Sequence, residues 1–133
     1  MLTIDKLKEY GADVQSGLQR CVNNESLYLS LVGMVPNNAS FKELYTKIES
    51  NDLEGAFSAA HSLKGITANL SLTPLVVLVN EITELLRNKT QMDYSKLIND
   101  IEEKRSLLEK LCNNWWLFKC LVLSISLIYL ELF

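Results

Sequence analysis

The chain has 133 residues, which suits one domain with a short appendage, and 48% of them are hydrophobic, enough to fill one core. Its formal net charge of −3 provides no basic field for holding phosphate backbones, which argues against a nucleic-acid partner. Five Gly and two Pro are too few for a fold with many β-turns, so the composition favours an all-helical protein.

The cysteines and the N-terminal residues indicate a cytoplasmic protein. Cys21, Cys112 and Cys120 form no C-x-x-C pair and are odd in number, which is typical of reduced thiols rather than of a disulfide framework. One His and three scattered Cys also argue against a tetrahedral zinc site. Residues 1–11 are charged and have no apolar core, so they do not resemble a secretory signal.

Short polar breaks divide the chain into six or seven expected helices. The first spans residues 4–10, between Thr3 at its start and Gly11, a residue common just past helix ends. A second helix, of one or two turns, is expected over residues 14–22 after Asp13. Both are short, so we expect them to be additions to a larger helical core.

The next two helices are indicated by capping residues. Asn24 can cap a helix over residues 25–35, which Pro36 ends. Its apolar residues recur at helical spacing: Leu27, Tyr28, Leu31 and Met34. Ser40 and Glu43 stand three residues apart, as in a capping box, which predicts the start of a further helix.

The longest helices follow. One is expected from Asn51 or Asp52 to about Leu70, and Thr73 and Pro74 open another, with Pro at a first-turn position where its missing N–H has no cost. The apolar stripe of the second consists of Leu75, Leu78, Val79, Ile82, Leu85 and Leu86.

A last amphipathic helix is expected to begin at Asp93, after the short loop of residues 88–92. Its inward residues are Tyr94, Leu97, Ile98, Ile101, Leu108 and Leu111. Because the loop is short, the two neighbouring helices should lie antiparallel, which predicts an all-α, up-and-down bundle.

The composition changes abruptly at Trp115, so we divide the chain into a bundle domain, residues 1–113, and a hydrophobic tail, residues 114–133. The uncharged stretch 120–130 is shorter than the roughly 20 apolar residues that span a bilayer. Three interpretations stay open: a membrane or interface segment, an extension of the last helix packed on the bundle or on a second chain, and an unnatural terminus.

The chemically distinctive residues lie in the helix expected over residues 52–70. On a helical wheel His61 lies opposite the apolar stripe, which contains Ala59, Leu63, Ile66 and Leu70. We therefore expect the imidazole to face water. The same face carries Glu54, Phe57, Ser58, Lys64, Gly65 and Ala68.

This exposed face suits phosphoryl transfer better than hydrolysis. A Ser-His-Asp mechanism needs an oriented nucleophile and an oxyanion hole, and one solvated helix face provides neither. A neutral imidazole is a good nucleophile, and Lys64, one turn along, can offset the charge of a phosphoryl group. Gly65 costs about 1 kcal/mol relative to Ala in a helix, so we interpret it as an opening for a partner's surface. Phe57 is either a contact for that partner or an edge of the core.

The ten residues from His61 to Leu70, HSLKGITANL, closely resemble the H-x-L-K-G-x-x-x-N-L signature of histidine-containing phosphotransfer (HPt) domains. The resemblance covers roughly residues 3–112, although only the central stretch is specific. Ala68 and Ser71 depart from it, since Gly is usual in the family at both positions. Neither change affects the nucleophile, but Ala68 lies on the face where a partner would dock.

The resemblance implies a four-helix bundle with extra N-terminal helices and a phosphorelay role in a two-component system. His61 would accept a phosphoryl group from an aspartate of one response-regulator receiver domain and donate it to another, and Lys64 would stabilise the phosphohistidine. The docking surface would comprise Phe57, Ser58, Gly65, Ala68 and Asn69.

The same resemblance implies no cofactor and no ATP-dependent kinase activity in this chain, because magnesium would belong to the receiver. A hybrid sensor histidine kinase is a further candidate partner. The alternative function is a non-catalytic helical interaction module that has kept an HPt-like bundle and lost phosphotransfer.

Overall fold

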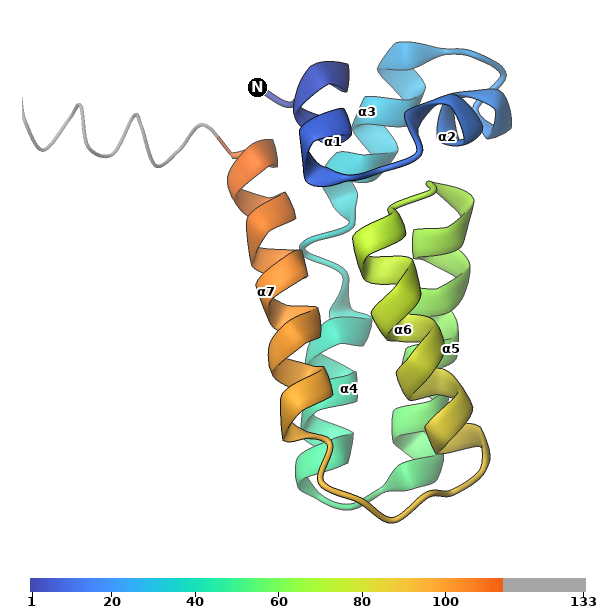
Figure 1. Ribbon diagram of the computed structural model, residues 1–133, viewed down its shortest axis with the longest axis vertical. Helices are drawn as coiled ribbons and strands as arrows, with labels where there is room; N and C mark the ends of the chain where they lie inside the picture. Colours follow the sequence, from blue (N-terminus) through green and yellow to red (C-terminus); the bar gives the residue numbers. More distant parts are fainter. Residues whose placement is uncertain (114–133) are drawn as a thin grey trace, which may run out of the picture.

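The computed structural model describes residues 1–113, and all regular secondary structure in that range is helical. Seven helices follow one another along this part of the chain (Figure 1): α1 (Ile4–Tyr10), α2 (Val14–Arg20), α3 (Glu25–Met34), α4 (Ala39–Glu49), α5 (Leu53–Asn69), α6 (Thr73–Arg87) and α7 (Ser95–Cys112). The predicted tail, residues 114–133, lies outside the described residues.

Helices α4 to α7 run alternately down and up and form an antiparallel four-helix bundle, with α1, α2 and α3 gathered at one end (Figure 1). Helix α5 packs against both α4 and α6, and α6 packs against α7. The all-α, up-and-down bundle with short N-terminal helices is therefore confirmed. The helix that carries His61 has neighbours on two sides, which leaves its remaining face open.

Side-chain caps fix where several helices begin. Each of these residues accepts a hydrogen bond from a backbone N–H of the first turn, which satisfies a donor that the helix itself leaves free: Thr3, Asp13, Asn24 and Asp52. Gly11 ends α1 with φ of 104°, a left-handed conformation that residues with a Cβ rarely adopt. These sequence expectations are confirmed.

Two predicted helix starts are wrong. Asn38, rather than Ser40, caps α4, because its Oδ1 accepts a hydrogen bond of 2.9 Å from the Ser40 backbone N–H. Ser40 therefore lies inside the helix, and there is no capping box with Glu43. Likewise α7 begins at Ser95, since Asp93 folds into a turn that accepts from both the backbone N–H and the hydroxyl of Ser95.

Two expectations for the N-terminal helices also need correction. Helix α2 ends at Arg20, because Val22 and Asn23 take positive φ values of 56° and 54° and turn the chain toward α3. In α3 only Tyr28 of the four periodic apolar residues is buried. The others remain exposed on the surface: Leu27 (43% exposed), Leu31 (38%) and Met34 (69%).

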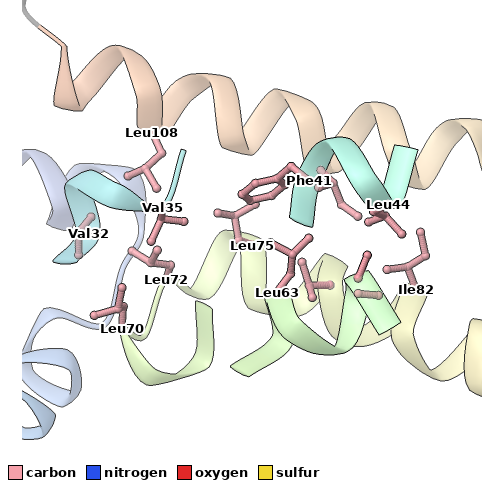
Figure 2. Close-up of a cluster of buried hydrophobic side chains, with 14 of the residues drawn as sticks. Val32, Val35, Phe41, Leu44, Leu63, Leu70, Leu72, Leu75, Ile82 and Leu108 are labelled. Atoms are coloured by element: carbon pink, nitrogen blue, oxygen red, sulfur yellow. The ribbon is translucent and has the colours of Figure 1, made fainter. Parts of the chain in front are cut away.

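The core runs the length of the bundle and continues beneath α3 (Figure 2). Leu63 of α5 and Leu75 and Ile82 of α6 are completely buried beside Phe41 and Leu44 of α4. Each such aliphatic side chain stabilises the fold by about 1.5–3 kcal/mol relative to exposure. This packing fixes the rotation of α5 about its axis, and hence which of its residues face solvent.

Hydrogen bonds to backbone carbonyls tie the N-terminal segment to the bundle. The Tyr28 hydroxyl donates to the Leu70 carbonyl over 2.9 Å, and the Tyr10 hydroxyl donates to that of Lys104 over 2.9 Å. Burial raises the pKa of Tyr28 to about 12, so this hydroxyl keeps its proton at physiological pH. The end of α5 is thereby held against α3.

Candidate functional site

The packing of α5 leaves His61 exposed in the middle of the helix. Ala60 and Leu63, on either side of it in the sequence, are completely buried, as are Ala56 and Thr67 one turn further out. The buried Thr67 hydroxyl donates to the Leu63 carbonyl over 2.8 Å, so the hydroxyl itself is not left unpaired. The position that the helical wheel predicts for His61 is confirmed.

The imidazole of His61 rests on an aromatic ring. The rings of Phe57 and His61 are stacked with centroids 5.8 Å apart and an interplanar angle of 29°. Phe57 is half-buried and also packs against the core, so it is both an edge of the core and a support for the imidazole. The guanidinium carbon of Arg87 lies 5.5 Å from the centroid of the Phe57 ring, within the range of a cation–π interaction.

Lys64 shares an acidic partner with Arg87. The Lys64 Nζ and an Arg87 guanidinium nitrogen lie 3.5 Å and 3.4 Å from the same oxygen, Oε1 of Glu84. Lys64 comes from α5, one turn after His61, whereas both charged partners come from the end of α6. Lys64, on the same face of α5 as His61, is thus linked through Glu84 to Arg87.

The other predicted site residues lie on or beside the same face. A Cβ atom on Gly65 would meet nothing within 4 Å, which shows that the helix is open there. Ser58 is exposed and its hydroxyl donates to the Glu54 carbonyl over 3.4 Å. Ala68 is half-buried, and its carbonyl accepts a hydrogen bond from the Arg20 guanidinium of α2.

An apolar groove adjoins this face at the end of α5. Its walls come from the last turn of α3 and the last turns of α5, and the residues that line it are Leu31, Met34, Val35, Asn38, Ile66, Asn69 and Leu70. Asn69 lies two turns beyond His61 and so joins the groove to the face that carries the imidazole. Leu31 and Met34, two of the exposed apolar residues of α3, thus belong to a depression beside the candidate site.

The family model for the Hpt domain matches residues 37–114, which include the whole of α4 to α7. The chain belongs to the Hpt family. Phosphotransferase RcsD of Escherichia coli (strain K12) is 35% identical over 75 residues, which are 56% of this chain. The chain spans only 8% of the length of RcsD. No solved structure matches.

Membership of the Hpt family supports a role in histidine phosphotransfer in general. The matched range contains His61, Lys64, Glu84 and Arg87. It begins after α3, so the outer wall of the apolar groove lies beyond the part shared with the family.

Two further observations concern residues 1–113. No group of three or more His, Cys, Asp or Glu side chains in this range is placed to hold a metal ion. None of the seven helices combines the length and the apolar character that crossing a bilayer requires.

Proposed function

We propose that His61 is the phosphoacceptor of this Hpt protein and that receiver domains of response regulators are its partners. It takes a phosphoryl group from the aspartyl phosphate of one receiver and passes it to the aspartate of another. The observation that carries the proposal is an exposed imidazole beside Lys64, within the range that matches the family. It is also the only His in the sequence.

The transfer is a substitution at phosphorus. The lone pair of the unprotonated ring nitrogen of His61 attacks the phosphorus atom and forms an N–P bond. The P–O bond to the aspartate breaks, and its electron pair leaves on the aspartate carboxylate. The second ring nitrogen keeps its proton. Lys64 stabilises the charge on the phosphoryl oxygens, and the stacked Phe57 limits the orientations of the imidazole.

The docking surface that we propose comprises the exposed face around the imidazole: Phe57, Ser58, Gly65, Ala68 and Asn69. A receiver must bring its phosphorylated aspartate to within bonding distance of the ring, and Gly65 removes the side chain that would obstruct this approach. The magnesium ion of the reaction belongs to the receiver in this proposal, and this chain needs no cofactor of its own. A hybrid sensor histidine kinase could supply the first phosphorylated receiver.

Transfer of radiolabel tests the proposal. The full chain is incubated with a panel of purified receiver domains that carry a labelled aspartyl phosphate, and separately with phosphoramidate, a small donor that needs no docking surface. We expect a label that is labile in acid and stable in base, and none on a His61→Gln variant whose circular dichroism is unchanged. A folded chain that takes no label from either donor would instead favour a non-catalytic interaction module.

A further inference from the structure

One carboxylate oxygen of Glu84, a residue of α6, contacts both Lys64, one turn after His61 on α5, and Arg87, which lies over the ring of Phe57. The contacts are long, 3.5 Å to Lys64 and 3.4 Å to Arg87, and the Lys64, Glu84 and Arg87 side chains are 35%, 53% and 50% exposed. Ion pairs of this kind contribute only about 0.2–1 kcal/mol each. A more highly charged anion can therefore displace the Glu84 carboxylate from both cations.

Arg87 is linked to the imidazole through the ring of Phe57. Its guanidinium sits over the ring of Phe57, and the same ring stacks on the imidazole of His61. A phosphoryl group on His61 would bring three oxygens and a charge of about −2 to this corner of the molecule. Arg binds such groups through several N–H donors, and Lys binds them as a compact charge.

We propose that Glu84 is a counter-ion latch: it holds Lys64 and Arg87 while His61 is unphosphorylated and yields both to the phosphoryl group after transfer. In this arrangement Arg87 is a second phosphate-binding cation, and Glu84 is a positioning residue that never touches the phosphorus. The inference rests on the proposed role of His61. It deepens that role by assigning a reason why the phosphoryl group is passed on instead of being retained.

The charges give the direction of the effect. Lys64, Arg87 and Glu84 together carry +1, so Glu84 cancels half of the positive charge that would stabilise the phosphohistidine. Once the cations turn to the phosphoryl group, the carboxylate is left without its partners and repels the new anion. Glu84 therefore raises the free energy of the phosphorylated state relative to the unphosphorylated one, which favours onward transfer to a receiver.

Equilibrium phosphotransfer with a receiver domain tests the latch in the full chain. Protein concentrations are kept below the dissociation constant, so that the ratio of phosphorylated chain to phosphorylated receiver does not depend on how tightly the two proteins dock. Glu84→Gln should raise this ratio by about two- to fivefold, the factor that corresponds to losing one or two exposed ion pairs. High salt should reduce the gain, because it screens exposed charges.

Matched variants separate the latch from other roles of Glu84. Arg87→Ala should lower the ratio by a similar factor, and Arg87→Lys should restore most of it because the charge is kept. Glu103→Gln removes the same charge from an exposed position of α7 without an ion pair among residues 1–113, and it should leave the ratio unchanged. Melting temperatures of all variants serve as the check on folding.

The outcomes distinguish the latch from the function on which it rests. A wild-type chain that accepts no phosphoryl group would overturn the proposed function and the latch with it. A wild-type chain that is phosphorylated, with Glu84→Gln at the same equilibrium ratio, would overturn the latch alone. A Glu84→Gln variant that changes the transfer rate at a constant ratio would assign Glu84 to docking and would also overturn it.

Discussion

Gly17 of α2 lies directly against the ring of Tyr28 of α3: a Cβ atom on Gly17 would stand 2.5 Å from the ring carbon Cε2. Tyr28 is completely buried, and its hydroxyl donates to the Leu70 carbonyl at the end of α5. The ring is therefore held from two sides and cannot move away cheaply. Through this contact α2 and α3 are fixed against the helix that carries His61.

Gly17→Ala should consequently destabilise the protein by about 1–3 kcal/mol, the usual effect of forcing extra volume into a packed core. The better helix propensity of Ala offsets at most about 1 kcal/mol of this loss. Chemical denaturation, followed by circular dichroism, measures the change. A variant as stable as the wild type would show that the Tyr28 ring can shift without losing its hydrogen bond to Leu70.

Gly65→Ala is the matched control for Gly17→Ala, because a Cβ atom at position 65 would meet nothing within 4 Å. It should be neutral or should raise the free energy of unfolding by up to about 1 kcal/mol, as expected from helix propensity alone. The same denaturation experiment measures it. A loss of stability would mean that α5 needs a glycine at this position for packing, which would weaken the argument that Gly65 serves docking.

A partly buried ion pair within α7, between Arg105 and Glu102, predicts how the stability of the protein depends on pH. Arg105 binds both carboxylate oxygens of Glu102, at 2.6 and 2.7 Å, and also donates to the Pro36 carbonyl over 3.0 Å. The hydrogen bonds from Arg105, followed by that from Tyr45, hold the pKa of Glu102 below its usual value. A pKa lowered by folding contributes stability at neutral pH that is lost as the pH falls through the folded-state value.

Glu102→Gln should therefore be less stable than the wild type by about 0.5–1.5 kcal/mol at pH 7, a modest effect because the Glu102 side chain is 42% exposed. The difference should shrink as the pH falls through the lowered folded-state pKa of Glu102 and the wild-type carboxylate takes up a proton. Urea denaturation over a descending pH series measures it, with Glu103→Gln as the control for net charge. A difference that stays constant as the pH falls would assign the effect to shape instead of charge.

The fold could be predicted from the sequence where hydrophobic periodicity and capping side chains agree. The stripe of α6 and the caps at Thr3, Asn24 and Asp52 are examples. The prediction failed at Ser40. The sequence there has a capping-box pattern, but the Asn38 side chain two residues earlier caps the helix by accepting from the Ser40 backbone N–H. It also failed for α3, because periodicity cannot distinguish a face that packs in the core from one that lines a surface groove.

Within the candidate site, the orientation of His61 could be predicted because the apolar stripe of α5 marks, within that helix alone, the face that packs in the core. Glu84 and Arg87 were missed, since they follow His61 by more than twenty residues and reach it through tertiary packing. A signal was nevertheless present in the sequence. A tight turn near Leu72 between antiparallel helices places residues equally distant from it side by side, which brings the region near residue 83 opposite His61.

The boundary between bundle and tail can be tested by truncation. The buried hydrophobic residues of the described range extend from Leu7 to Leu108, and α7 ends at Cys112. We therefore expect a chain that ends at Asn114 to keep the helical circular dichroism of residues 1–113 and to melt cooperatively. A molten or insoluble product would show that residues 115–133 complete the core, and that the predicted boundary is wrong. If only the full chain partitions into liposomes, the membrane interpretation of the tail gains support.

The proposed role of Lys64 predicts a partial loss of function. Lys64→Ala should still accept a phosphoryl group from phosphoramidate, but more slowly, because the imidazole remains and one phosphate-binding cation is lost. The rate should fall less than in His61→Gln, where the nucleophile is absent and no label is expected. The rate of incorporation of label measures the effect. An unchanged rate would show that Lys64 does not contact the phosphoryl group.

Gly65→Gln separates docking from chemistry at the same site. The open space around Gly65 should let the longer side chain fold without strain, so the free energy of unfolding should change by about 1 kcal/mol or less. The Gln side chain would nevertheless stand one turn from His61, on the face that a receiver must approach. Transfer from a phosphorylated receiver should therefore slow at least tenfold, about 1.4 kcal/mol of lost docking, while labelling by phosphoramidate keeps its wild-type rate. Slowing with both donors would mean that Gly65 matters for the reactivity of the imidazole, and slowing with neither would remove the docking argument.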